Sequence, residues 1–295
     1  MSRKTPQKAA PVRLAVIGGS GLYQLEGATD VKEVRVKTPF GDPSDAIILA
    51  TVAGVRVAFL PRHGRGHKLL PGEVPSRANI WALKSLGVER IVSVSAVGSL
   101  KEELAPRHFV FPDQLTDETK GRPSTFFGKG VVAHVAFAHP FCGDMADFLY
   151  GQALAAGIVS HKGGTYACME GPLFSTKAES DKHRQLGFSL IGMTASPEAK
   201  LAREAEICYQ PVALVTDYDC WKEDDHVSTE KVVEHLVANV GNARLLLQAA
   251  LPKLAALPRR CACATALKGA VFTDPKAMDK KTKKTLMPLI GKYVS

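Results

Sequence analysis

The stretch PVALVTDYDCW, residues 211–221, joins an apolar run to two acidic side chains. Its first six residues are rich in β-branched side chains and bounded by proline, which indicates a buried strand of a parallel sheet. Carboxylates at the buried end of such a strand are costly unless another group pairs with them. Asp217 and Asp219 are therefore the first candidates for a functional role.

Other apolar segments alternate with helical patterns along the chain. Strand patterns cover residues 13–19, 90–99, 164–172 and 189–193, and a hairpin around Ala53 and Gly54 joins 45–52 to 55–64. Helical patterns cover 77–87, 143–157, 175–187, 196–207 and 228–254, with Ser175, Ser196 and Ser228 as expected N-caps. This alternation predicts a single α/β domain with helices flanking a mostly parallel sheet. In such sheets ligands bind near the carboxyl ends of the strands.

Composition and charge narrow the class of protein. The 295 residues are 45% hydrophobic and 23% charged, and no apolar stretch has the length of a membrane-spanning helix. The basic start lacks the apolar segment of a secretory signal, so a cytoplasmic protein is expected. The net charge of +9 lies at the two ends of the chain. We expect a flexible basic N-terminus (1–10), a main domain (11–257) and a basic C-terminal extension (258–295), with both ends solvated rather than bound to nucleic acid.

The cysteines fall into two groups. Four lie singly in apolar or mixed segments, where cysteine usually acts as a small buried hydrophobe: Cys142, Cys168, Cys208 and Cys220. The other two, Cys261 and Cys263, form a CxC pair. A zinc site would need two more ligands at a suitable spacing, so we expect either an oxidisable pair or two free thiols.

A glycine-rich turn follows the first predicted strand. GGSG, residues 18–21, exposes backbone N–H groups beside the hydroxyl of Ser20. Its spacing matches neither a dinucleotide fingerprint nor a P-loop, and Leu22 stands where a nucleophile elbow needs glycine.

Three further strand ends carry polar residues. LPRHGRGH contains Arg62, whose planar guanidinium suits phosphate, while a metal site of His63 and His67 has no supporting carboxylate motif. SAVGS (95–99) adds a hydroxyl and open backbone amides. Thr194 stands directly before a predicted helix start, where N–H groups favour anions. Together these strand ends would make a phosphate site.

Eight segments resemble one known family, in order and with few gaps. They are VIGGSGL, TPFGDPSDAI, RHGRGH, ANIWALKSLG, SAVGSLKEEL, MEGPLFSTKAES, MTASPEAKLAREAEICY and TDYDCWKEDD. They are similar to the 5′-methylthioadenosine phosphorylases, a branch of the trimeric purine nucleoside phosphorylases. The resemblance covers about residues 13 to 250, and CAC is similar to a CxC pair of archaeal thermophilic members. It implies a mixed, mostly parallel sheet and a homotrimer or dimer of trimers with active sites near subunit interfaces.

The resemblance also implies which residues bind the substrates. It places phosphate on Ser20, Arg62, His63, Ser95, Ala96 and Thr194. It places the nucleoside on Phe174 and Ser175 by the base, Met193 under the ribose, and Asp217 and Asp219 on the purine. His134 matches a residue lent by the neighbouring subunit to a 5′ pocket lined by Thr229 and Val232.

The reaction implied is reversible phosphorolysis of methylthioadenosine to adenine and 5-methylthioribose 1-phosphate, the chemistry of a pentosyltransferase in purine and methionine salvage. Phosphate is a co-substrate, and no metal, organic cofactor, nucleic acid or membrane is expected to take part. The enzyme must hold an anion beneath a ribosyl cation-like state and neutralise the leaving purine. Asp217 would act as general acid toward N7, shared with Asp219.

Two alternatives are weighed against this function. The first is a sibling enzyme that acts on 6-oxopurine nucleosides such as inosine or methylthioinosine. Siblings of that kind tend to carry Asn near Asp219, and this chain does not. The second is a non-catalytic nucleic-acid-binding protein that uses the basic ends, which would leave the polar strand ends without a role.

Overall fold

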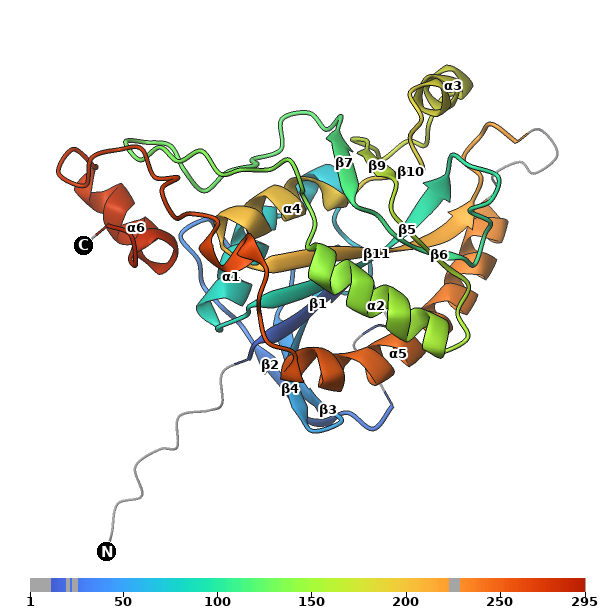
Figure 1. The fold of residues 1–295 in the computed structure, drawn as a ribbon, viewed down its shortest axis with the longest axis horizontal. Helices are drawn as coiled ribbons and strands as arrows, with labels where there is room; N and C mark the ends of the chain where they lie inside the picture. Colours follow the sequence, from blue (N-terminus) through green and yellow to red (C-terminus); the bar gives the residue numbers. More distant parts are fainter. Residues whose placement is uncertain (1–11, 20–21, 23–25, 223–228, 295) are drawn as a thin grey trace, which may run out of the picture.

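The computed structural model describes residues 12–19, 22, 26–222 and 229–294, without the side chains of 229–232 (Figure 1). The predicted basic N-terminus (1–10), the predicted phosphate ligand Ser20 and the predicted N-cap Ser228 lie outside the described residues.

An 11-stranded mixed sheet forms the centre of the molecule (Figure 1). Its middle strand, β5 (Arg90–Ser99), pairs in parallel with β1 (Leu14–Gly18) and with β11 (Cys208–Asp217). The β1 side continues through parallel β4 (Val55–Pro61) to antiparallel β3 (Ile47–Val52) and β2 (Thr29–Val34). The predicted turn at Ala53 and Gly54, both at positive φ, joins β3 to β4.

The carboxyl end of β5 is a branch point of the sheet. Gly98 pairs with Asp217 of β11 and also with Ile191 of β10 (Leu190–Gly192), which runs antiparallel to β5. From β10 the sheet continues to β9 (Thr165–Cys168) and β7 (Gln114–Asp117), while β6 (Phe109–Phe111) and β8 (Ser160–Lys162) extend from β11. The two branches diverge around the last residues of β5.

Helices cover both faces of the sheet (Figure 1). One face packs against α1 (Ser76–Ser85) and α4 (Ala195–Glu204), and the other against α2 (Gly143–Ala155) and α5 (Thr229–Ala256). Alternate residues of β1 point to the two faces: Ala15 and Ile17 join the first core, Leu14 and Val16 the second. The predicted single α/β domain with a mixed, mostly parallel sheet is confirmed.

Two helix starts differ from the prediction. The N-cap of α3 (Lys177–Gln185) is Thr176 rather than Ser175, because only Thr176 stands three residues before Glu179 and forms a capping box with it. In α4 the backbone is extended at Ser196 before Pro197, but the Ser196 hydroxyl donates to Asp117 (2.6 Å) instead of capping the helix.

The C-terminal extension is not a solvated tail, so that prediction is wrong. Residues 258–294 fold back onto the core through η2 (Ala262–Thr265) and α6 (Lys280–Ile290), and Leu267 and Ile290 are fully buried. The buried carboxylate of Glu206 accepts hydrogen bonds from Leu267 N (3.0 Å) and Tyr293 Oη (2.6 Å) and pairs with Lys292 (2.5 Å). Helix α6 is rich in lysine, but its apolar side chains pack against the core and hold the helix in place.

A short 3-10 turn, η1 (Pro71–Glu73), precedes α1. Within the described ranges, no helix combines the length and the apolar character that crossing a membrane would require.

Candidate active site

The carboxyl end of β5 is open to solvent in the middle of the sheet. Residues 90–94 are buried, whereas Ser95 and Gly98 are half-buried and Ala96 is exposed. An exposed residue in a central strand shows that the helices leave the sheet uncovered there. Parallel sheets bind ligands at this end of their strands, so the exposed part of β5 is the natural floor of a site.

Arg62 directly follows β4 and is buried beneath this floor. Its Nε donates to Glu198 Oε1 (2.6 Å) and its Nη2 to Glu198 Oε2 (3.2 Å), while Ser93 Oγ (2.7 Å) and Val94 O (2.9 Å) accept the other bonds. Burial opposes the charge, but the Glu198 carboxylate outweighs it and raises the pKa of Arg62. The bidentate fork expected to bind phosphate is thus occupied by Glu198, and one Nη1 hydrogen lies outside these bonds.

His63 is a neutral residue in this structure. Burial, assisted by the Arg62 charge, lowers the pKa of His63 to about 4. Its Nδ1 lies 2.9 Å from Leu69 O, which can only accept, so Nδ1 carries the proton and Nε2 has a free lone pair. The His63 ring stacks on His67 at 4.4 Å. A neutral His63 can accept a hydrogen bond from a protonated phosphate oxygen.

The side chain of Tyr166 in β9 lies between the predicted phosphate hydroxyls. Burial raises the pKa of Tyr166 to about 12, and the nearby hydroxyls of Thr194 and Ser95 act in the opposite direction. The Tyr166 hydroxyl is buried and has no hydrogen-bond partner among the described residues. It packs closely against Gly192: a Cβ added at residue 192 would lie 2.0 Å from the Tyr166 oxygen. A buried orphan hydroxyl beside Ser95 and Thr194 fits a site that an anion completes.

The two aspartates lie beside Gly98 on the other side of the opening. Asp217 ends β11 and accepts from Thr216 Oγ1 (2.7 Å) and from Asp219 N (2.8 Å). Burial raises the pKa of Asp217, and the Asp219 carboxylate adds to the effect. Asp219 is 5% exposed, and its Oδ2 is buried without a partner among the described residues. A buried carboxylate oxygen without a partner is suited to accept a hydrogen bond from a ligand.

The acid pair is held together by a turn rather than by an extended strand. The chain leaves β11 at Asp217 and bends back through Asp219, whose φ is +51°. The backbone N–H of Asp219 then reaches the carboxylate of Asp217, which fixes their separation. Gly98 is required opposite them, because a Cβ there would lie 2.9 Å from Asp217 Oδ1.

The loop before α3 lies beside the acid pair. Cys220 Sγ donates to Ser175 O at 3.4 Å, which ties this loop to the turn that carries Asp219. Phe174, the preceding residue, is 62% exposed. The structure therefore brings Ser175 to the predicted base side and leaves the Phe174 ring uncovered on the same loop.

Arg122 holds the segment that carries Met193. Its Nη1 donates to Met193 O (2.7 Å) and Ser196 O (3.0 Å), and its Nε donates to Glu170 Oε2 (3.0 Å). Met193 in turn packs on Gly171, where a Cβ would lie 2.4 Å from the Met193 sulfur. Met193 and Thr194 are therefore fixed between the predicted phosphate and base sides.

Three predicted residues are not brought to this site by the described structure. His134 is exposed; its N–H donates to Ala270 O (2.9 Å), and its ring meets Phe272 edge-on at 5.1 Å. In the part of the chain that the structure describes, no hydrogen bond, ion pair or ring contact joins His134 to the end of β5. Thr229 and Val232 lie on α5, but their side chains lie outside the described residues.

Sequence reasoning missed Glu198, Tyr166 and Arg122. Glu198 had a usable signal, because it shares a face of the helical pattern with Ala195, Ala199 and Ala202, and a carboxylate on an apolar face needs a buried partner. The other two depend on contacts between segments distant in sequence, which no local pattern shows.

Comparisons with known proteins agree with this geometry. The sequence model of the Phosphorylase superfamily matches residues 13–252. S-methyl-5′-thioadenosine phosphorylase of Koribacter versatilis is 56% identical over 283 residues, which cover 95% of this chain and 96% of the relative. A methylthioadenosine phosphorylase from an antarctic soil metagenomic library has a crystal structure that matches with a TM-score of 0.91 and 50% identity over 95% of this chain and 99% of that chain.

A more distant structure was solved with a ligand. It is a variant of adenosine/methylthioadenosine phosphorylase from Schistosoma mansoni in complex with methylthioadenosine. It matches with a TM-score of 0.78 and 37% identity, and covers 84% of this chain and 93% of that chain. The chain therefore belongs to the S-methyl-5′-thioadenosine phosphorylases of the phosphorylase superfamily.

Proposed function

We propose that this chain is a pentosyltransferase that catalyses the reversible phosphorolysis of methylthioadenosine. Phosphate attacks the anomeric carbon of the ribose, the bond from that carbon to N9 breaks, and adenine leaves with its electron pair. The products, adenine and 5-methylthioribose 1-phosphate, would enter purine and methionine salvage. The methylthioadenosine bound to the Schistosoma mansoni variant supports this substrate.

One observation carries the proposal. The exposed Ala96 on β5 has polar groups that lack partners on both of its sides: the Tyr166 hydroxyl near Ser95 and Thr194, and the Asp219 carboxylate near Gly98. A phosphate on the first side and a purine on the second would satisfy both. A ribose would then span the exposed strand between them, over Met193.

On the phosphate side, neither Arg62 nor His63 offers a free positive charge that could pair with the anion. Glu198 already compensates the charge of Arg62, and His63 is neutral. Hydroxyls, the N–H groups before α4 and the remaining Arg62 hydrogen would therefore carry most of the contacts. Donors fixed by the fold need no reorganisation as charge shifts to the sugar, which is how positioned dipoles lower a barrier. This chemistry requires no organic cofactor or catalytic metal.

The base side supplies a proton. A carboxyl whose pKa is raised retains its proton closer to neutral pH, so Asp217 can donate to purine N7 as the glycosidic bond breaks. Asp219 carries the orphan oxygen and suits a donor such as the 6-amino group of adenine.

A coupled assay tests the function directly. We expect phosphate-dependent release of adenine from methylthioadenosine, with weaker activity on methylthioinosine and inosine. A preference for the 6-oxopurine nucleosides would establish the sibling activity instead. Absence of phosphate-dependent cleavage of any nucleoside would contradict the proposal.

Asp219→Asn should change the choice of base. The amide can turn its NH₂ toward a carbonyl, whereas an ionised carboxylate repels that oxygen. An unpaired buried polar group costs about 1–3 kcal/mol, so the ratio of kcat/KM for methylthioadenosine to that for methylthioinosine should fall roughly 5- to 150-fold. Asp181→Asn, at a half-exposed position of α3, is the matched control. An unchanged ratio in Asp219→Asn would show that this residue only braces the turn.

We also propose a homotrimer, or a dimer of trimers, in which His134 completes a neighbour's 5′ pocket. The support is a patch of exposed side chains around His134: Val132 is 45% and Phe272 68% exposed. Contiguous exposed apolar patches are typical of surfaces that contact another protein. No nucleic acid or membrane is a proposed partner, and the six free thiols fit the reducing cytoplasm.

Mixed assemblies test this arrangement. His134→Ala and Asp217→Asn subunits should each be weakly active alone, and mixing them should restore part of the activity. The reason is that a mixed trimer contains pockets with an intact Asp217 from one chain and an intact His134 from the next. Native mass spectrometry must show that mixed trimers form. Mixed trimers without any rescue would mean that each pocket is built from one chain.

A further inference from the structure

Four cysteine thiols meet at the end of the sheet opposite the candidate active site. Cys142 precedes α2, Cys208 begins β11, and Cys261 and Cys263 belong to the C-terminal extension. Their sulfur atoms all lie within 4.8 Å of one another, and Cys208 Sγ and Cys261 Sγ are 3.2 Å apart. All six cysteines of the chain are free, so Cys261 and Cys263 are not an oxidised pair in this structure. The fold brings Cys142 and Cys208 to the CxC pair, and so supplies the two further ligands that a zinc site needs.

The spacing of the sulfurs matches one tetrahedral metal ion. A Zn–S bond of about 2.3 Å places the corners of a tetrahedron about 3.8 Å apart, inside the observed limit. Four thiolates in this arrangement are the donor set of a structural zinc site, in which all four positions come from the protein. An iron–sulfur cluster places its cysteines farther apart because the inorganic sulfides lie between them.

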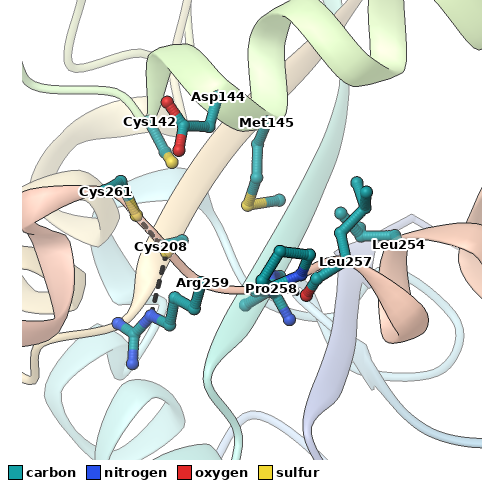
Figure 2. A pocket seen from close by; sticks show the side chains of 10 residues that line it. Cys142, Asp144, Met145, Cys208, Leu254, Leu257, Pro258, Arg259 and Cys261 are labelled. Carbon is teal, nitrogen blue, oxygen red and sulfur yellow. Dashed lines mark hydrogen bonds between the residues drawn. The ribbon is translucent and has the colours of Figure 1, made fainter.

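The surroundings suit a negative complex. Zn²⁺ with four thiolates has a net charge of −2, and two guanidinium groups, those of Arg90 and Arg259, line a cavity of about 30 Å³ that adjoins Cys142, Cys208 and Cys261. Arg259 Nε donates to Cys208 Sγ at 3.2 Å. Figure 2 shows the three thiols turned toward one another, with Arg259 beside Cys208 and with the exposed Asp144 on the rim.

We propose that Cys142, Cys208, Cys261 and Cys263 bind one structural Zn²⁺ that fastens the C-terminal extension to α2 and β11. Binding converts four thiols to four thiolates and releases their four protons to solvent. The site lies about 30 Å from Asp217, the length of the ten-residue strand that separates them, so its effect is on stability and not on the chemistry.

Metal analysis of the full-length, tag-free protein tests the proposal. After expression with added zinc, we expect about one zinc per chain, and X-ray absorption should show four sulfurs at about 2.3 Å. Cys261→Ser/Cys263→Ser should lose the zinc, while Cys220→Ser, whose thiol is outside the cluster, should keep it. Removing zinc with a chelator should lower the thermal midpoint of the parent and leave that of the double variant unchanged.

Four results would overturn the proposal. Zinc-free protein with four thiols that react with a thiol reagent would show free cysteines. A mass deficit of two hydrogens per bond in unreduced protein would show disulfides. Iron in place of zinc would overturn the choice of ion. A folded, zinc-free double variant that has lost activity would contradict a purely structural role.

Discussion

Asp217→Asn should lower kcat/KM for methylthioadenosine by about 10²- to 10⁴-fold, the range that a positioned general acid contributes. Asparagine keeps the shape of the side chain: its oxygen can still accept from the backbone N–H of Asp219, and its NH₂ can donate to the Thr216 hydroxyl, which accepts as well as donates, so the fold should survive. What disappears is the acidic proton that burial retains on Asp217. The alkaline limb that this proton gives to the pH profile of kcat should disappear with it.

A substrate that needs no proton separates this role from a structural one. A 7-methylated purine nucleoside carries its positive charge before the bond breaks, so its cleavage should fall far less in Asp217→Asn than cleavage of methylthioadenosine. Equal losses on both substrates would mean that Asp217 only shapes the pocket. A loss within a few-fold on methylthioadenosine would exclude it as the general acid.

Arg62→Ala should both destabilise the protein and impair phosphate use. The variant leaves the Glu198 carboxylate, only 1% exposed, without its ion-pair partner, and breaking a buried pair in this way costs about 3–5 kcal/mol. The remaining Arg62 hydrogen is also lost to the anion, so the KM for phosphate should rise while the KM for the nucleoside changes little.

A double variant distinguishes the two effects. Arg62→Met/Glu198→Gln removes both charges and keeps a group that can bond to Ser93 and Tyr209, which contact Glu198 in the parent. Its denaturation midpoint should return toward the parent value, whereas its KM for phosphate should stay high. Recovery of phosphate affinity together with stability would show that Arg62 serves only to neutralise Glu198.

The sequence predicted those parts of the fold whose signal is local. Strand β1, residues 90–94 of β5 and most of β11 are runs buried on both faces, and the β3–β4 turn has a glycine at its second position. Strand β7 was missed because QLTD is half-buried and polar, and β2 because TDVKEV is an exposed edge. Helix α6 was missed because its lysines dominate its composition, although three of its apolar side chains are buried.

The site was predictable only as a set of residue types at strand ends. Arg62 was found by its position after a strand, but its partner Glu198 is 136 residues away, and the distance hides the pairing. The same holds for Cys142 and Cys208, which appeared as isolated apolar cysteines. The positive φ of Asp219 accompanies the hydrogen bond from its backbone N–H to the Asp217 carboxylate, a local geometry without a sequence pattern.

The docked C-terminal extension also determines at which stage of synthesis the fold can be completed. Ribosomes make a chain from its N-terminus, and domains fold as units once their segments are available. Glu206 is buried, yet its bonds to Leu267, Lys292 and Tyr293 come from residues that are synthesised after every strand of the described sheet. A nascent chain that already contains the entire described sheet therefore still holds an uncompensated carboxylate, and the fold closes only after the C-terminal extension has been made.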